Sequence, residues 1–236
     1  MSKEPDITIE SARELVSDAA LWPRVRNFLW DFAPQVHESW LEGLDCGAAA
    51  AGGGDGAEPP VPRLMSNPRV RRFILSSLGV EPCFHTFPKG DWSRLLLLDG
   101  ATLESIVKWL GAISASDALR RITGGADVRG LKASLPGVYP EVFGYTEYFR
   151  KLKVGGAELK SGGTAAEGVV EIGSSLLFAL AGSLPEPLLC RLRLKLPKAM
   201  SAEGASGRGP STSVIQPSTM QLLLKLRFPE AYSLCC

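Results

Sequence analysis

Residues 171–197 read EIGSSLLFALAGSLPEPLLCRLRLKLP and join an apolar helical pattern to a run of alternating leucines and cations. The alternation occupies CRLRLKLP at 190–197, where Leu192, Leu194 and Leu196 alternate with Arg191, Arg193 and Lys195. Side chains two positions apart share one face of a strand. The pattern therefore predicts a strand at about 190–197, with one apolar face and one positive face, that ends at Pro197.

The residues before this run predict a helix from about 164 to 181, because its apolar side chains recur at helical spacing. The same period predicts further helices on both sides, at 9–21, 23–33, 35–44, 68–79, about 100–113, 116–122, within 126–153 and at 220–228. Candidate N-caps are Asp99 or Thr102, Ser116 and Ser218. We therefore expect a mainly α fold with a small β element near the C-terminus.

Three glycine-rich segments interrupt these patterns, at about 46–62, 154–163 and 198–217. Glycine, alanine, serine and proline without apolar periodicity are typical of flexible loops. The first is too short to establish a domain boundary. We therefore expect one compact helical domain over residues 1–236, with these segments as loops.

Composition indicates an ordinary soluble protein, with 45% hydrophobic and 22% charged residues. The polar N-terminal stretch has no apolar core of the kind found in signal peptides. The most apolar stretch, 168–182, is shorter than a membrane span and contains Glu171. Five scattered cysteines favour reduced thiols, and no motif supports lipidation of Cys235 and Cys236. We expect a cytoplasmic protein.

Charge is distributed unevenly although the net charge is only +1. Residues 1–60 carry 4 basic and 11 acidic side chains, a net charge of −7, whereas residues 187–236 carry 7 basic and 2 acidic side chains, a net charge of +5. Such unlike ends can bind two different partners or attract each other within the fold. The second interpretation is the simpler one.

The sequence contains no catalytic, cofactor-binding or metal-binding signature. GGADVRG at 124–130 lacks the lysine and hydroxyl residue of a phosphate-binding loop, and the two histidines, His37 and His85, have no metal-ligand spacing. A pI of about 7.6 argues against nucleic acid as a partner. We expect no enzyme activity, no cofactor and no metal.

Aromatic residues cluster in two places, and core packing is the simpler interpretation of both. The first cluster consists of Trp22, Trp30 and Trp40. The second consists of Tyr139, Phe143, Tyr145, Tyr148 and Phe149, followed by cations at one end only. Such a cluster of rings can also stack on nucleic-acid bases, but an amphipathic helix packs in the same way, and core packing is favoured.

The order of these features resembles the YscK/SctK family, the accessory K component of the bacterial type III secretion sorting platform. The residues that carry the resemblance are ALWPRVRNFLWDFAP, LLLLDGATLESIVKWLG, EIGSSLLFALAGSLPEP leading into LLCRLRLKLP, and the closing TMQLLLKLRFPEAYSLCC. The region from about 170 to 236 carries it best. The glycine-rich segments 46–62 and 154–163 depart from the family pattern.

The resemblance implies a non-enzymatic adaptor at the cytoplasmic face of the bacterial inner membrane. Such an adaptor is attached to the membrane through other proteins and is not itself inserted into the bilayer. Its implied partners are the cytosolic domain of the inner-membrane ring protein and the C-ring-like pod protein, with the stator of the export ATPase further along the assembly. The alternative is a small soluble hydrolase or transferase, in which His37 or His85 approaches a carboxylate or a cysteine. A secretion chaperone is disfavoured by the chain length and near-neutral charge.

Within the adaptor hypothesis, the cationic run has two interpretations. As a structural feature, the cations of an edge strand discourage edge-to-edge aggregation. As a functional feature, Arg191, Arg193 and Lys195 form a candidate patch that binds an acidic partner surface. The structural interpretation is favoured, since exposed charge pairs contribute little.

Overall fold

Thr164 begins the longest described helix, α10 (Ala165–Ala181). Its hydroxyl accepts the backbone N–H of Glu167, and the Glu167 carboxylate accepts the backbone N–H of Thr164. This capping box satisfies two of the amide groups that a helix start leaves unpaired. It confirms the helix expected over 164–181.

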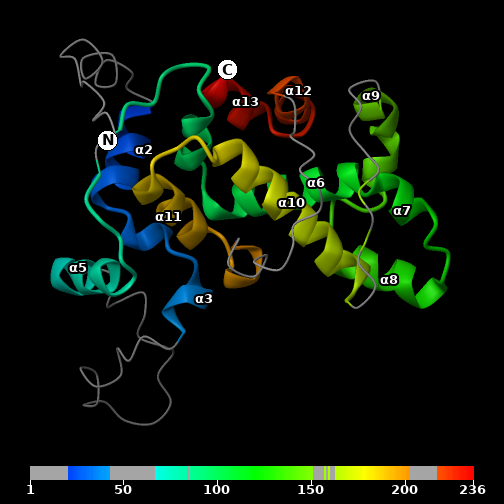
Figure 1. Ribbon diagram of the computed structural model, residues 1–236, viewed down its shortest axis with the longest axis horizontal. Helices are drawn as coiled ribbons and strands as arrows, with labels where there is room; N and C mark the ends of the chain where they lie inside the picture. The colour runs from blue at the N-terminus through cyan, green and yellow to red at the C-terminus, as the bar shows by residue number, and fades with distance from the viewer. Residues whose placement is uncertain are drawn as a thin grey trace, which may run out of the picture.

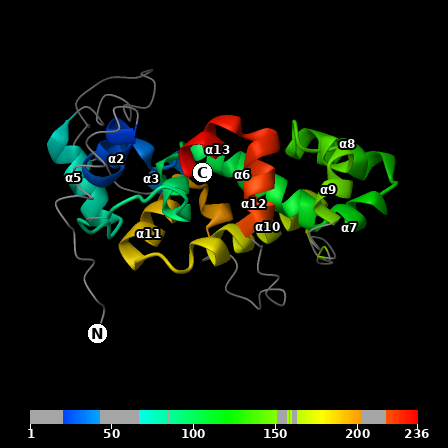
Figure 2. The ribbon, with the colours of Figure 1, turned by 90° about the horizontal axis from the view of Figure 1, so that it is seen from above.

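The structure, a computed structural model, describes residues 21–42, 67–83, 85–150, 157, 159, 163–201 and 217–236. This part of the chain is mainly helical, contains no strand and forms an elongated body (Figures 1 and 2). The expected helix at 9–21 lies outside it except for Leu21, as do the loop at 46–62 and most of those at 154–163 and 198–217. A continuous apolar core runs from Leu21 to Cys235.

Two antiparallel helices, α6 (Gly100–Ser114) and α10, pack against each other at the centre of the body (Figure 1). Asp99 is the N-cap of α6, as expected, and its carboxylate accepts the N–H of Thr102. The helices touch at Gly111 and Gly173. A Cβ atom at Gly111 would lie 1.8 Å from the carbonyl oxygen of Val169, so only glycine permits this contact.

The end of the body that contains the first described residues is built from α2 (Leu21–Trp30), η1 (Ala33–Gln35), α3 (Glu38–Leu41) and α5 (Pro68–Ser77). Val25, Phe28, Leu29 and Phe32 are buried, which confirms the expected apolar face of the second helix. Pro68 follows the N-cap Asn67, and Gly79, with a φ of 67°, follows the end of α5.

Helices α7 (Ser116–Arg120), α8 (Gly125–Ser134) and α9 (Thr146–Arg150) build the opposite end of the body together with η4 (Glu141–Gly144) (Figures 1 and 2). The helices expected within 126–153 correspond to α8 and α9, which η4 and the turn around Pro136 separate, and residues 151–153 lie outside the described part of the chain. Ser116 is not the cap of α7, because the helix follows Ala115 and has no side-chain cap.

The remaining elements are η3 (Trp92–Leu97), α11 (Glu186–Lys195), η5 (Lys198–Met200), α12 (Pro217–Arg227) and α13 (Pro229–Cys235). The helix expected at 220–228 corresponds to α12. Pro229 ends that helix as expected, and it also lies in the first turn of α13, where its missing N–H is not needed.

The strand expected at about 190–197 is wrong, because residues 186–195 form helix α11. Pro187 in the first turn, acidic Glu186 near the start and Lys195 near the end all suit a helix. Leu188, Arg191, Leu192 and Lys195 then occupy one helical face, and all four are buried. A lone strand would also have needed a pairing partner, and the described residues contain none.

Candidate docking surfaces

The three cations expected to form a positive patch do not share an exposed face. Arg191 and Lys195 are buried, with 2% and 1% of their surface exposed, and only Arg193 reaches solvent. The patch of Arg191, Arg193 and Lys195 is therefore wrong as an exposed ribbon. The physical reason is the helix, which turns positions 191 and 195 inward together.

Arg191 caps the C-terminal end of α2. Its Nη1 donates to the carbonyl oxygens of Phe28 at 2.7 Å and Leu29 at 3.2 Å, and its Nη2 donates to the carbonyl oxygen of Glu81 at 2.8 Å. The guanidinium also lies 5.4 Å from the centre of the Phe32 ring. Carbonyls at a helix end lack intrahelical partners and attract cations. Burial nevertheless lowers the pKa of Arg191.

Lys195 performs the same role for η3. Its Nζ donates to the carbonyl oxygens of Leu96 at 2.6 Å and Leu98 at 2.7 Å, and it lies 5.0 Å from the centre of the Phe28 ring. Burial lowers the pKa of Lys195 to about 7, against an opposing effect of the Asp99 carboxylate. These two cations fix α11 to α2 and η3, so they are part of the interior.

Arg193 is the remaining member of the expected patch. Its Nη1 forms an ion pair with Glu186 Oε1 at 2.6 Å on the same helix, and its side chain is 28% exposed. Partner binding by Arg193 stays a prediction.

A second kind of surface, which the sequence reasoning missed, consists of exposed aromatic side chains at one end of the body. Trp30 of α2 is 53% exposed and Phe73 of α5 is 57% exposed. The Trp30 ring lies 5.8 Å from the Trp22 ring, centre to centre. The Arg71–Asp31 ion pair, 2.5 Å long, links α5 to the residue after α2. We call α2 and α5 together the α2–α5 surface.

The expectation that all three tryptophans of the first cluster pack in the core is therefore wrong for Trp30. Trp22 and Trp40 are half-buried, and Trp40 Nε1 donates to the carbonyl oxygen of Leu196 at 2.8 Å. The exposure of Trp30 could have been predicted from the helical spacing of the apolar residues in α2. The rotation that turns Val25 and Phe28 inward places Trp30 on the opposite side of α2.

Tyr148 of α9 is exposed at the opposite end, with 55% of its surface accessible. Phe149 beside it is buried, and the other rings of this cluster are half-buried, so core packing holds for most of the cluster but not for Tyr148. Arg120 Nη2 donates to Thr146 Oγ1 at 2.5 Å, which fixes the start of α9 to α7. We call this region the α9 surface.

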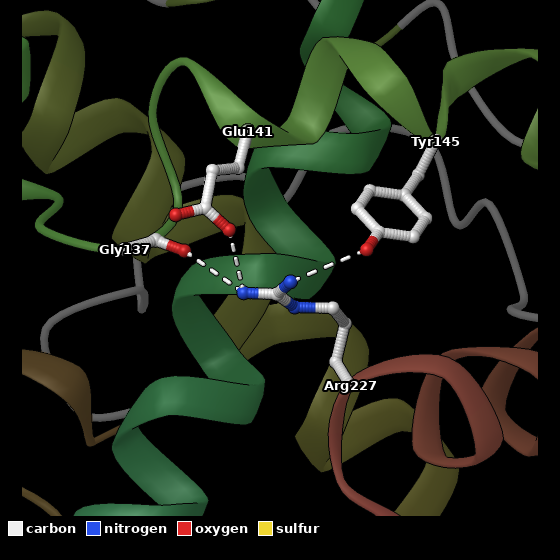
Figure 3. A network of polar contacts seen from close by, with 4 residues as sticks. All are labelled: Gly137, Glu141, Tyr145 and Arg227. Atoms are coloured by element: carbon white, nitrogen blue, oxygen red, sulfur yellow. Dashed lines mark hydrogen bonds and ion pairs between the residues drawn. The ribbon is translucent and has the colours of Figure 1, made fainter.

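A polar network around Arg227 attaches α12 to the elements that precede the α9 surface (Figure 3). Its Nη2 donates to Glu141 Oε2 at 2.7 Å and to the carbonyl oxygen of Gly137 at 3.3 Å, and its Nη1 donates to Tyr145 Oη at 3.3 Å. The guanidinium also stacks 4.4 Å from the centre of the Trp109 ring. The network holds η4 and Tyr145 in place ahead of α9.

The two histidines of the enzyme alternative have different surroundings. His37 is the N-cap of α3, where its Nδ1 accepts the N–H of Ser39 at 3.2 Å. Burial lowers the pKa of His85, against an opposing effect of the nearby Asp91 carboxylate. The His85 Nε2 is buried and has no hydrogen-bond partner among the described residues. A narrow apolar crevice between η3, α10 and α11 is lined by leucines together with Trp92 and Ala181.

Two further observations concern metals and membranes. Within the described ranges, no group of histidines, cysteines and carboxylates is placed to hold a metal ion. None of the helices there has the length and apolar character needed to cross a bilayer.

Comparisons of this chain with protein-family models, curated proteins and solved structures gave no match. The resemblance to the YscK/SctK family therefore depends on the sequence features alone.

Proposed function

We propose that this chain is a non-enzymatic adaptor of the sorting platform of a bacterial type III secretion system. In this role it links the cytosolic domain of the inner-membrane ring protein to the C-ring-like pod protein at the cytoplasmic face of the inner membrane. Protein secretion depends on that link. The stator of the export ATPase lies further along the same assembly.

The observation that supports an adaptor is the placement of exposed aromatic residues at opposite ends of an elongated helical body. Trp30 and Phe73 lie at one end and Tyr148 lies at the other (Figures 1 and 2 show the elements that carry them). Aromatic residues and arginines dominate the energetics of protein interfaces. A protein that holds two neighbours apart needs two such surfaces, each on a rigid element.

The interior suits the same role, since it fixes the distance between the two surfaces. Gly111 and Gly173 lock α6 to α10, Arg191 caps α2 and Arg227 attaches α12 to η4. Contacts made by backbone and charged groups in this way allow little relative movement of the two ends.

The test is removal of the gene from the native bacterium, followed by measurement of type III substrates in the medium and of pod-protein foci at the membrane. We expect both to be lost and both to return with the wild-type gene. Normal secretion without this chain would refute the proposed function.

Surface variants then test the two-ended arrangement by co-purification. The double variant Trp30→Ala and Phe73→Ala should lose one partner and keep the other, and Tyr148→Ala should show the reverse pattern. Lys225→Ala, at an exposed position of α12 in the middle of the body, is the matched control and should keep both partners. Loss of both partners in every variant would indicate a single binding region.

A further inference from the structure

The α2–α5 surface carries an unusual excess of arginine. Helices α2 and α5 contain five arginines and no acidic residue, as LWPRVRNFLW and PRVRRFILSS show. Arg71 pairs with Asp31, whereas Arg24, Arg26, Arg69 and Arg72 are exposed and form no ion pair with a carboxylate of the described residues.

Two buried cations lie beneath the same surface. Arg191 binds carbonyl oxygens of α2, and Lys195 lies over the Phe28 ring of α2. Arg191 forms no ion pair with a described carboxylate, and a charge in a poorly polarisable interior projects its field further than a charge in water. Lys195, with a pKa of about 7, adds only part of a charge at neutral pH. Within residues 21–42 and 67–83 the acidic groups are Asp31, Glu38, Glu42 and Glu81, which are fewer than the five arginines of α2 and α5.

The aromatic residues of the surface have the properties of interface anchors. Trp30 is held against Trp22 while half of its surface remains accessible, so little conformational freedom is left to lose on binding. Arg69 lies one helical turn before Phe73 on the exposed side of α5, and Arg72, which precedes Phe73 in the sequence, is also exposed. Tryptophan and arginine together are the residues most enriched in binding hot spots.

We propose that the α2–α5 surface binds an acidic segment of a protein partner, whose carboxylates pair with Arg26 and Arg72 and whose apolar side chains cover Trp30 and Phe73. The guanidinium fork matches a carboxylate in two parallel hydrogen bonds. This inference rests on the proposed function, because the α2–α5 surface is one of its two docking ends.

A protein fits these observations better than a lipid surface or a nucleic acid. A helix that lies on a membrane turns its apolar face toward lipid, whereas the apolar face of α2 is buried in the core. Nucleic-acid binding favours a strongly basic chain, and the net charge here is +1.

The experiment measures binding of the full chain to a fluorescein-labelled amphipathic peptide built from glutamate, leucine and phenylalanine. The same peptide with glutamine at every glutamate is the neutral control. We expect the acidic peptide to bind at least about tenfold more tightly than the neutral one, and added salt to weaken its binding. Equal binding of the two peptides would overturn the proposal.

Variants locate the site on the α2–α5 surface. The pair R26E and R72E should weaken binding at least about tenfold, and W30A should weaken it about fivefold or more. The matched control is the pair R121E and R129E at the opposite end of the body, where both arginines are also exposed. The neutral pair R26Q and R72Q provides the same test if charge reversal impairs folding. Unchanged binding in the R26E, R72E variant and in the R26Q, R72Q variant would overturn the proposal.

Other occupants are distinguished in the same assay. Tighter binding of phosphatidylserine vesicles or of oligothymidylate than of the acidic peptide would overturn the proposal in favour of a membrane or a nucleic acid. The acidic residues that precede α2 in this chain could occupy the surface in place of a partner. This is tested in the full chain by replacing each of them with its amide, at Glu4, Asp6, Glu10, Glu14 and Asp18. A gain of about tenfold in peptide affinity would identify that segment as the occupant and overturn the proposal.

The result is independent of the secretion experiment. If the peptide does not bind but secretion still requires the gene, the acidic partner is refuted and the adaptor function stands. Specific peptide binding with secretion unaffected by gene removal would refute the secretion role and leave the acidic docking surface in place.

Discussion

The ammonium nitrogen of Lys195 lies 2.6 Å from the carbonyl oxygen of Leu96 in the interior of the protein. A second carbonyl, that of Leu98, and the face of the Phe28 ring complete its surroundings. These groups replace the water around an exposed lysine, but none of them carries a full negative charge. Burial therefore dominates and lowers the pKa of Lys195 to about 7 from an ordinary 10.5.

We predict that the free energy of unfolding rises with pH between pH 7 and 9 because of Lys195. In this range the unfolded chain keeps the lysine protonated and the folded chain releases the proton, so the unfolded state binds more protons. The slope contributed by this one group is at most about 1.4 kcal/mol per pH unit. Urea unfolding of the wild type and of Lys195→Met, compared across this range, measures it.

The difference between the two curves is the informative quantity. Above pH 9 the buried Cys235 thiol, whose pKa is raised to about 12, acts in the opposite direction, because only the unfolded chain ionises it there. Cys235 is present in both proteins and cancels in the difference. If the wild type and Lys195→Met show parallel curves from pH 7 to 9, Lys195 keeps its proton and the prediction is wrong.

The burial of Arg191 and Lys195 explains why the strand predicted at residues 190–197 was wrong. Alternating leucine and cation fits a strand only if every cation must face water, which is the usual rule. Arg191 and Lys195 break the rule because the unpaired carbonyls of α2 and η3 receive them. Those carbonyls come from residues about 100 or more positions away in the chain, so no local pattern announces them.

Local signals succeeded where the deciding contacts are local. The capping residues Thr164 and Asp99 and the apolar face around Phe28 lie within a few residues of the groups they satisfy. The exposure of Trp30 follows from the same helical spacing once α2 is placed. By contrast, the α2–α5 surface depends on how α5 meets the end of α2 through Arg71 and Asp31, 40 residues apart.

Because α6 and α10 are in close contact where they cross, we predict that Gly111→Ala and Gly173→Ala each lower the free energy of unfolding by about 1–3 kcal/mol or more. The added Cβ would lie 1.8 Å from the carbonyl oxygen of Val169 in the first case and 1.9 Å from that of Val107 in the second. Both obstacles are backbone, so the helices themselves must separate. Thermal or urea unfolding of each variant measures the loss.

Gly130→Ala on α8 is the matched control for this pair. A Cβ at Gly130 meets no atom within 4 Å, and alanine favours a helix more than glycine does. This variant should be neutral or more stable by up to about 1 kcal/mol. A cost at Gly130 as large as that at Gly111 would contradict the close-contact explanation.

Arg227 should contribute more to stability than an ordinary exposed ion pair, since its guanidinium donates to three groups (Figure 3). The guanidinium also stacks on the Trp109 ring. We predict that Arg227→Lys costs about 1–2 kcal/mol, because an ammonium ion cannot stack and donate in that geometry. Glu141→Gln should cost less, within about 1 kcal/mol, as the carboxylate is half-exposed.

A double-mutant cycle between Arg227 and Glu141 separates the ion pair from the stacking. Most of the Arg227 contribution should remain when Glu141 is already changed. The comparison pair is Arg193 and Glu186, which share only a single surface ion pair, and Arg193→Lys should change stability by less than about 0.5 kcal/mol. Equal effects at positions 193 and 227 would show that the stacking contributes nothing.

Trp30 and Phe73 are predicted to contribute little to folding, which separates a docking role from a structural one. Each exposes more than half of its surface, at 53% and 57%, so truncation to alanine should cost about 1.5 kcal/mol or less of the free energy of unfolding, even with the Trp30–Trp22 contact. Phe28→Ala is the contrasting variant. That ring is fully buried and lies near both Arg191 and Lys195, so its loss should cost about 3–5 kcal/mol.

Urea unfolding of the three variants makes the comparison, and a cost above about 2 kcal/mol for Trp30→Ala would mean that the ring stabilises the fold. If the loss is small, the exposed rings are retained for a reason other than stability, and a binding defect in Trp30→Ala can be assigned to the surface itself.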